Sequence, residues 1–255
     1  MENNPVIQVK DLTIGYENEV VLNNISFDVH QGEIFIILGG SGCGKSTLLR
    51  HMIGLQEPYR GEVLIDGRDL VTANSREHHQ IIRKFGVLFQ SSALLSSMTL
   101  AENVALPLEE YTHLPRKMVD FLVRAKLGMV GLLGYEGYLP DQLSGGMRKR
   151  AGIARAMALD PEILFFDEPS AGLDPITSAS LDDLIMQLNA SLGTTMVIVT
   201  HELPSIYAIA NRVIMLDKRT KKIIAEGNPA DLRDRSADPF VRDFFNRQVG
   251  EGVYS

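Results

Sequence analysis

A glycine-rich segment near the N-terminus constrains the fold of this 255-residue chain more than any other feature. It reads Gly39-Gly40-Ser41-Gly42-Cys43-Gly44-Lys45-Ser46 and fits the pattern G-x-x-x-x-G-K-[ST]. The apolar run Ile34 to Leu38 before it predicts a buried strand, and the helical spacing from Lys45 to Gly54 predicts a helix. Such glycines let backbone N–H groups approach phosphate oxygens at the positive end of a helix. The segment therefore predicts a strand, a phosphate-binding loop and a helix, in that order.

The end of this loop carries side chains that suit a nucleotide triphosphate and its metal. We expect Lys45 to reach the β- and γ-phosphates of ATP and the Ser46 hydroxyl to bind Mg²⁺. The next residue, Thr47, belongs to the same predicted ATP site. A phosphate site of this kind also needs an acid that holds the metal, and another segment of the chain has to supply it.

The apolar run Ile163 to Phe166 supplies this acid, because it ends in Asp167 and Glu168. We expect Asp167 to hold Mg²⁺, through water, at the end of a buried strand. Glu168 is then placed to accept a proton from the attacking water as a general base. A glutamate at this position predicts hydrolysis of ATP rather than binding alone.

Two further polar residues follow short predicted strands. His201 comes directly after the run Met196 to Thr200, so it should emerge at the carboxyl edge of the sheet and contact the γ-phosphate. Gln90 follows the run Val87 to Phe89, and its amide oxygen can bind Mg²⁺ or water. Taken alone, a histidine at a strand end is more often an ordinary surface residue, so the prediction for His201 depends on the other motifs. The alternative for Gln90 is a polar loop residue.

A second glycine pair lies far from the first. The segment Leu143 to Met147 contains Ser144, Gly145 and Gly146, and it precedes a predicted helix from Arg148 to Ala158. Small residues at a helix start can form an anion-binding site. Two such helix starts distinguish this chain from an ordinary phosphate-loop protein.

The predicted fold class is α/β. β-branched runs dominate the first forty residues and predict strands, and a predicted helix from Ser178 to Leu192 separates two buried strands, as in a parallel sheet. After Glu102 the pattern is helical through Ala158, which predicts a helical insert. Within this insert three prolines are expected to break the helices, namely Pro107, Pro115 and Pro140.

Composition narrows the functional class. The formal net charge is −7 and no basic excess is present, so nucleic acid is not an expected partner. Cys43 is the single cysteine and forms no internal disulfide, and the chain opens without a leader-like segment, so a cytosolic protein is expected. The apolar runs are far shorter than the roughly 20 residues that cross a bilayer.

Together these residues resemble the ATP-binding subunit of an ABC (ATP-binding cassette) transporter over nearly the whole chain. The matched motifs are Walker A (Gly39 to Ser46), the Q-loop glutamine (Gln90), the signature (Leu143 to Met147), Walker B (Phe165 to Glu168), the D-loop (Ser170 to Asp174), the switch histidine (His201) and the aromatic residue that stacks on adenine (Tyr16). The resemblance implies a P-loop NTPase cassette with a mostly parallel core sheet, an N-terminal antiparallel β subdomain and a helical insert. The catalytic residues implied are Glu168, His201, Lys45 and Gln90.

In this family two cassettes associate head to tail, which places each ATP between the Walker A loop of one chain and the signature of the other. ATP binding closes the pair and hydrolysis opens it. The nucleotide-binding residues implied are Tyr16, Gly39, Gly40, Ser41, Gly42, Cys43, Gly44, Lys45, Ser46, Thr47, Gln90, Ser144, Gly145, Gly146 and Asp174, and the metal ligands are Ser46, Gln90 and Asp167. The expected domain is a single cassette over 1–255, with a core at about 1–90 and 159–225, a helical subdomain at about 91–158 and a helical tail at about 229–255.

Departures from the usual family pattern point to a subfamily. Met147 replaces the usual glutamine of the signature, and Gly40 replaces the usual proline of Walker A. With the segments Gln90 to Leu95, Asn103 to Leu108 and Thr112 to Pro115, they make the chain resemble ATPases of Mla/Mce-type phospholipid transporters. That resemblance implies two permease subunits and an Mce-type lipid-binding protein as partners, at the cytoplasmic side of the bacterial inner membrane.

Several alternatives stay open at this point. The chain could serve an importer of amino acids or another small solute, since the cassette chemistry would be the same. A cassette that acts on DNA or ribosomes, or a small-molecule P-loop kinase, fits the motifs less well. The apolar residues Leu94, Leu95 and Met98 are expected to be exposed, and they could contact a permease or pack within the helical insert. The apolar face of the tail, from Phe240 to Phe245, could dock on its own domain or on a partner cassette.

Overall fold

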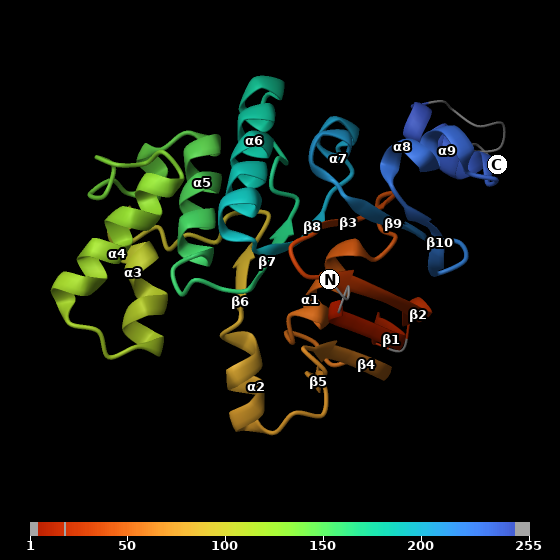
Figure 1. Cartoon of the computed structure of the whole chain (residues 1–255), viewed down its shortest axis with the longest axis horizontal. Helices are drawn as coiled ribbons and strands as arrows, with labels where there is room; N and C mark the ends of the chain where they lie inside the picture. The colour runs from red at the N-terminus through yellow and green to blue at the C-terminus, as the bar shows by residue number, and fades with distance from the viewer. Residues whose placement is uncertain (1–4, 18, 248–255) are drawn as a thin grey trace. The chain divides into compact units, whose positions relative to one another are not determined.

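The computed structural model describes residues 5–17 and 19–247. The chain divides into two compact units, the first comprising residues 1–78 with 197–255 and the second residues 79–196 (Figure 1). The predicted helical insert lies inside the second unit. Each unit has its own strands and helices, and each is described by itself below.

The first unit contains an antiparallel sheet with strand order β2-β1-β4-β5. These strands are β1 (Pro5–Tyr16), β2 (Glu19–His30), β4 (Arg60–Ile65) and β5 (Arg68–Asp69). In the centre of the sheet Val9 pairs with Phe27 on one side and with Val63 on the other, and all three are buried. The predicted N-terminal antiparallel β subdomain is therefore confirmed.

The first unit also contains the strand that leads into the glycine-rich loop. Strand β3 (Ile34–Gly39) is buried along its whole length and pairs in parallel with β9 (Arg212–Asp217), which pairs antiparallel with β10 (Lys222–Gly227). The helix α1 (Lys45–Met52) follows the loop. Strand β8 (Thr195–Val199) spans the boundary between the units in the sequence, and its last three residues belong to the first unit.

Three short helices close the first unit, namely α7 (Leu203–Ile209), α8 (Pro229–Arg235) and α9 (Pro239–Asn246). On α9, Val241 and Phe245 are buried, and the Tyr207 hydroxyl donates to the Phe245 carbonyl at 2.9 Å. The described part of the tail therefore docks on its own unit. Residues 248–255 of the predicted tail lie outside the described residues.

The second unit pairs β6 (Phe85–Leu88) in parallel with β7 (Ile163–Asp167). The helix α2 (Ser75–Ile82) leads into it, and α6 (Pro175–Leu192) follows β7. A Cβ added at Gly86 would lie 2.1 Å from the Ala156 carbonyl oxygen, so β6 approaches the end of α5 (Gly145–Ala156) too closely for any other residue. These parallel pairs confirm the predicted α/β class.

The helical part of this unit consists of α3 (Leu100–Tyr111), α4 (Arg116–Met129), the 3₁₀ turn η1 (Pro140–Gln142) and α5, and Figure 1 draws α3, α4 and α5 as neighbours. Pro115 and Pro140 stand at helix starts, as predicted. The prediction that Pro107 breaks a helix is wrong, because Pro107 lies inside α3. Proline forfeits one hydrogen bond there, and the burial of Val104 and Leu108 on the same helix outweighs that loss.

Among residues 5–17 and 19–247, no helix combines the length and apolarity needed to cross a membrane.

Candidate active site

The phosphate loop (residues 39–46) is shaped by glycines in backbone conformations that other residues adopt only under strain. Gly39 has φ 148°, Gly42 has φ 72° and Gly44 has φ 103°. A Cβ at Gly39 would lie 2.5 Å from the Leu216 carbonyl oxygen, and one at Gly44 would lie 2.6 Å from Val21. The loop is therefore held against its neighbours in a shape that requires glycine.

The surface of this loop fits a polyphosphate. The ammonium group of Lys45 donates to the carbonyl oxygens of Gly39 at 2.9 Å and Gly40 at 3.1 Å, so the charge lies over the loop. The N-cap Gly44 offers no side-chain acceptor to α1, and the first turn of this helix carries no acid. No atom lies within 4 Å of a Cβ built at Gly40. An open loop with a cation and a helix N-terminus can bind phosphate oxygens.

Cys43 contributes only its backbone to this loop. Its side chain is buried, and its backbone N–H donates to the Gly40 carbonyl at 3.3 Å. Burial raises the pKa of the thiol, and the nearby charge of Lys45 opposes this rise only in part. The thiol therefore stays protonated and is not a nucleophile.

Tyr16 is anchored to the helix that follows the phosphate loop. Its hydroxyl lies 2.7 Å from the Thr47 hydroxyl, which is buried on α1, while 40% of Tyr16 remains exposed. An aromatic ring fixed at one end and open at its face can stack on a nucleotide base. His201 belongs to the same unit, is exposed, and follows the end of β8 after Thr200.

The predicted acids lie in the second unit, where β7 ends. Asp167 and Glu168 are buried, with 7% and 8% of their surfaces exposed. Glu168 has φ 49°, an uncommon backbone conformation for a residue with a side chain. Such conformations persist only where surrounding contacts impose them, and they occur often at catalytic sites.

A buried lysine links the main chain of this acid to the main chain of Gln90. The Lys149 ammonium, on α5, donates to the Glu168 carbonyl at 3.1 Å and to the Gln90 carbonyl at 2.6 Å. Burial lowers the pKa of Lys149, and the carboxylates of Asp167 and Glu168 oppose this. The structure thus brings Gln90 and Glu168 together around one side chain that the sequence did not single out.

The segment after Gln90, here called the Gln90 loop (residues 90–99), is held in place by another buried side chain. Asn103 accepts from the Leu95 N–H at 2.8 Å, and its amide donates to the carbonyls of Leu95, Met98 and Thr99. Leu95 is exposed, as predicted. Leu94 and Met98 are half-buried, which corrects the prediction that all three are exposed.

The signature segment starts α5 and lies against the start of α6. Ser144 caps α5 by accepting from the Met147 N–H at 3.3 Å, and a Cβ at Gly146 would lie 2.5 Å from the methyl group of Thr177. Asp174 in turn caps α6 by accepting from the N–H groups of Ile176 and Thr177, both at 3.1 Å. Hydrogen bonds from Thr177 lower the pKa of Asp174. The two helix starts are therefore joined directly.

Within residues 5–17 and 19–247, no group of three or more His, Cys, Asp or Glu side chains could hold a metal ion. The predicted ligands lie apart in the chain, with Ser46 in the first unit and Gln90 and Asp167 in the second. Hydroxyl, amide and carboxylate oxygens suit Mg²⁺, which usually keeps several waters and phosphate oxygens as ligands. By ligand type, the oxygen atoms that Ser46, Gln90 and Asp167 offer are therefore suited to Mg²⁺.

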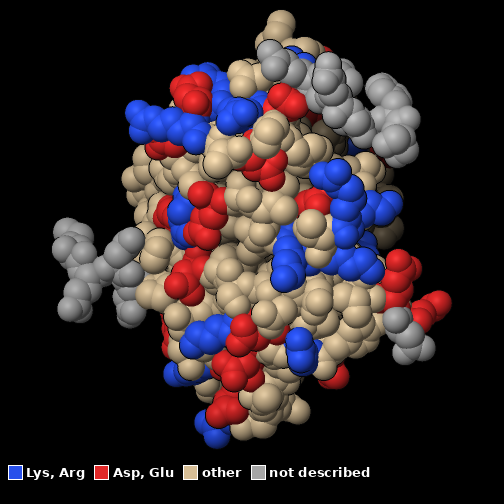
Figure 2. Space-filling model, turned by 90° about the vertical axis from the view of Figure 1, so that its right-hand side faces the viewer, with Lys and Arg blue, Asp and Glu red and all other residues tan. Residues whose placement is uncertain are grey.

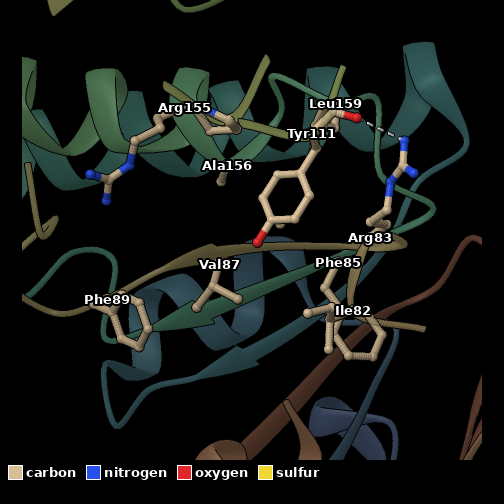
Figure 3. Close-up of a pocket in the computed structure, with 11 residues that line it drawn as sticks. Ile82, Arg83, Phe85, Val87, Phe89, Tyr111, Arg155, Ala156 and Leu159 are labelled. Carbon is tan, nitrogen blue, oxygen red and sulfur yellow. Dashed lines mark hydrogen bonds between the residues drawn. The ribbon is translucent and has the colours of Figure 1, made fainter. Parts of the chain in front are cut away.

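A cavity of about 380 Å³ opens in the second unit between β6 and the C-terminal ends of α3 and α5 (Figure 3). Phe85 and Phe89 form part of its apolar wall, and Arg83 and Arg155 also line it. Arg83 donates to the Tyr111 carbonyl at 3.3 Å. The cavity is therefore partly apolar, with the two arginines among its lining residues.

Comparison with known proteins gives consistent results. A family model described as "ABC transporter" matches residues 22–171. The MlaF protein of Escherichia coli K12, named an intermembrane phospholipid transport system ATP-binding protein, is 40% identical over 94% of this chain and 88% of its own length. A protein of Mycobacterium leprae named a probable ribonucleotide transport ATP-binding protein is 42% identical over 96% of this chain and 70% of its own length.

Solved structures resemble the chain in the same way. CbiO1 of Clostridium perfringens, part of an ABC transporter complex, matches with a TM-score of 0.83 and 26% identity over 91% of this chain and 92% of its own. The bacterial cassette MJ0796, solved as a dimer, matches with a TM-score of 0.79 and 33% identity over 87% of this chain and 98% of its own. MJ0796 has also been solved after hydrolysis, bound to ADP and phosphate.

Proposed function

Since the chain belongs to the ABC transporter family, where it is an ATP-binding and ATP-hydrolysing subunit, we propose that it powers phospholipid transport through separate membrane permease subunits. For hydrolysis, the observation that carries the proposal is the buried pair Asp167 and Glu168 at the end of β7, with the Glu168 main chain fixed by Lys149. For phospholipid as the cargo, it is the 40% identity to MlaF over most of both chains.

In this proposal each site residue has a defined task. The phosphate loop and Lys45 bind the phosphates of ATP, and Tyr16 stacks on the adenine. Ser46, Gln90 and Asp167 hold Mg²⁺, which when bound neutralises charge on the phosphates.

The catalytic tasks belong to Glu168 and His201. Glu168 accepts the proton of the attacking water, and the contacts that fix its backbone orient its carboxylate for that step. His201 contacts the γ-phosphate from the end of β8. His201 is exposed, which supports this role.

A second copy of the chain completes the site. Ser144 is exposed and Gly145 half-exposed at the start of α5, so their backbone groups remain accessible to a nucleotide bound by another chain. Ile176, beside the cap residue Asp174, is 83% exposed, which is unusual for an apolar residue on an ordered helix. Both features support a head-to-tail dimer of this chain, and the similar cassette MJ0796 has been solved as a dimer.

Membrane partners fit the second unit. The exposed Leu95 and the cavity between β6, α3 and α5 give apolar surface for a permease segment. With an Mce-type lipid-binding protein as a further partner, the chain would lie peripherally at the cytoplasmic side of the bacterial inner membrane.

A small solute is the second candidate cargo, because one group of relatives is named for ribonucleotide transport. Nucleic acid as a partner is disfavoured by the net charge of −7, and the face in Figure 2 displays acidic as well as basic side chains. Purification of the tagged chain in mild detergent separates the cargo hypotheses. We expect an Mce-type subunit and bound phospholipid, whereas co-purification of a soluble binding protein for amino acids or nucleotides would overturn the phospholipid proposal.

Glu168→Gln tests hydrolysis itself. Glutamine keeps the shape but cannot accept the proton, so turnover should fall by about 100-fold or more while ATP binding and a closed dimer persist. ATPase rate and ATP binding, measured on the same preparation, check this. A variant with full activity would refute the role of Glu168 as the general base.

A further inference from the structure

Helix α5 directs two cations at the main chain of the Gln90 loop. Lys149, which is 5% exposed, donates to the carbonyls of Gln90 and Glu168. Further along α5, Arg155 donates to the carbonyls of Ala93 at 2.6 Å and Ser92 at 3.0 Å. Four carbonyl groups are therefore held by two side chains of the helix that begins with the signature.

The loop needs this support because of its backbone conformation. Ser92 has φ 63° and Ala93 has φ 47°, so two consecutive residues with side chains adopt the left-handed region that favours glycine. No local sequence feature imposes this shape, since neither residue is glycine or asparagine. The donors from α5 are contacts that impose it from outside.

We infer that Lys149 is a positioning residue for ATP hydrolysis, which makes the start of α5, the Gln90 carbonyl and the Glu168 turn move as one piece. This inference rests on the proposed function, since it concerns the alignment of Gln90 and Glu168. The ammonium fixes the backbone from which the side chains of Gln90 and Glu168 extend. A shift of the signature helix is thereby transmitted to the metal-binding glutamine and to the general base.

The chemistry of lysine suits this task. An ammonium group has three donors on a compact head, so it can serve two carbonyls that come from different directions. Asp167 and Glu168 lie close enough to stabilise its charge. Methionine would fill a similar volume with no donor and leave both carbonyls without this partner, whereas arginine would keep the charge and the donors.

Three variants of the full-length chain test the inference, with ATP and Mg²⁺ as the probes. Lys149→Met should lower kcat about tenfold or more, since small misplacements of catalytic groups are costly, and it should leave KM for ATP within about threefold. The Mg²⁺ concentration that gives half-maximal activity should rise several-fold, because the Gln90 backbone is released. Lys149→Arg should restore most of kcat. Lys149→Gln keeps neutral hydrogen-bond donors, so its kcat should lie between those of Lys149→Met and Lys149→Arg.

A matched control is Lys126→Met on α4. Lys126 is also 5% exposed and pairs with Asp160, away from Gln90 and Glu168. Its loss should lower Tm and leave kcat and the Mg²⁺ requirement of the folded protein unchanged.

The outcomes distinguish a failure of the positioning role of Lys149 from a failure of the proposed function. If Lys149→Met lowers only Tm, as the control does, or keeps the wild-type kcat, the positioning role is overturned. If Lys149→Met does not fold, Lys149→Gln carries the same test, and a wild-type kcat and Mg²⁺ requirement there would equally overturn it. If the wild-type chain itself hydrolyses no ATP, the proposed function fails first.

Discussion

The phosphate loop and the Gln90 loop reach unusual backbone conformations by opposite means. In the phosphate loop the positive φ angles fall on Gly39, Gly42 and Gly44, which adopt them without steric cost. In the Gln90 loop they fall on Ser92 and Ala93, which do not, and side chains from α3 and α5 hold the backbone in place. The first shape is encoded locally and the second is imposed by tertiary contacts.

The largest loss of stability is expected when a glycine with positive φ in the phosphate loop is replaced. In Gly39→Ala the new Cβ would lie 2.5 Å from the Leu216 carbonyl and 2.6 Å from the Cys43 sulfur. We expect a loss of about 3 kcal/mol of unfolding free energy, from the strained φ and the clash. Urea denaturation would check this. Gly40→Ala is the control, because nothing lies within 4 Å of its Cβ. Equal losses in both variants would contradict the argument.

The next effect concerns the tertiary contacts of the Gln90 loop. Asn103→Ala removes the acceptor of the Leu95 N–H and the donor to three carbonyls, all around a fully buried side chain. We expect a loss of about 2 kcal/mol or more, because buried backbone groups lose their partner. Hydrogen exchange should rise at residues 95–99 and stay unchanged in the phosphate loop. Uniform exchange across both loops would argue against an externally held Gln90 loop.

The end of the Gln90 loop has its own local signal, a capping box in which Glu102 accepts from the Thr99 N–H at 2.7 Å and the Glu102 N–H donates to the Thr99 hydroxyl. Hydrogen bonds from Thr99 lower the pKa of Glu102 below its ordinary 4.5. Its stabilisation is therefore complete above pH 4.5 and is lost as pH falls through the folded-state pKa.

Glu102→Ala should thus lower Tm by about 2 °C at neutral pH. The difference from wild type should shrink in acid, and thermal melts at both pH values measure it. Glu102→Gln, which cannot titrate, should keep a difference from Ala that does not change with pH. A pH-independent gap between wild type and Glu102→Ala would contradict the assigned cause.

The smallest effect has the opposite sign. Ala93→Gly removes the left-handed strain of an exposed residue, which stabilises the fold, but it also adds entropy to the unfolded state, which offsets part of that effect. We expect a net gain of about 0.5 kcal/mol in the free energy of unfolding. The pair Gly39→Ala and Ala93→Gly therefore tests the comparison directly with one denaturation assay. A clear loss of stability in Ala93→Gly would show that its conformation is not strained.

This contrast explains what the sequence could predict. The phosphate loop, the acids after β7 and Ser144 could be proposed as site residues from the sequence, because each belongs to a pattern of neighbours within a few residues in the chain. The sequence did not single out Lys149 or Asn103. The partners of Lys149 lie 59 and 19 residues away in the chain, and those of Asn103 lie up to 8 residues away. The one available signal was Lys149 itself, a charged residue on the helix face that also carries Gly146 and Ile153, both buried. Pro107 was misread because packing of α3, not propensity, decides its helix.

Cys43 has a practical consequence for the study of this chain. It is the sole cysteine of the sequence, only 2% of it is exposed, and burial raises its pKa. Thiol reagents react with accessible thiolates, so the native chain should remain almost unlabelled under mild conditions. A single cysteine introduced on the surface, for example at Ile176, would then carry a fluorophore or spin label alone. Because the buried thiol of Cys43 does not compete for the label, distances between two copies of the chain can be measured during the ATP cycle without removing this cysteine.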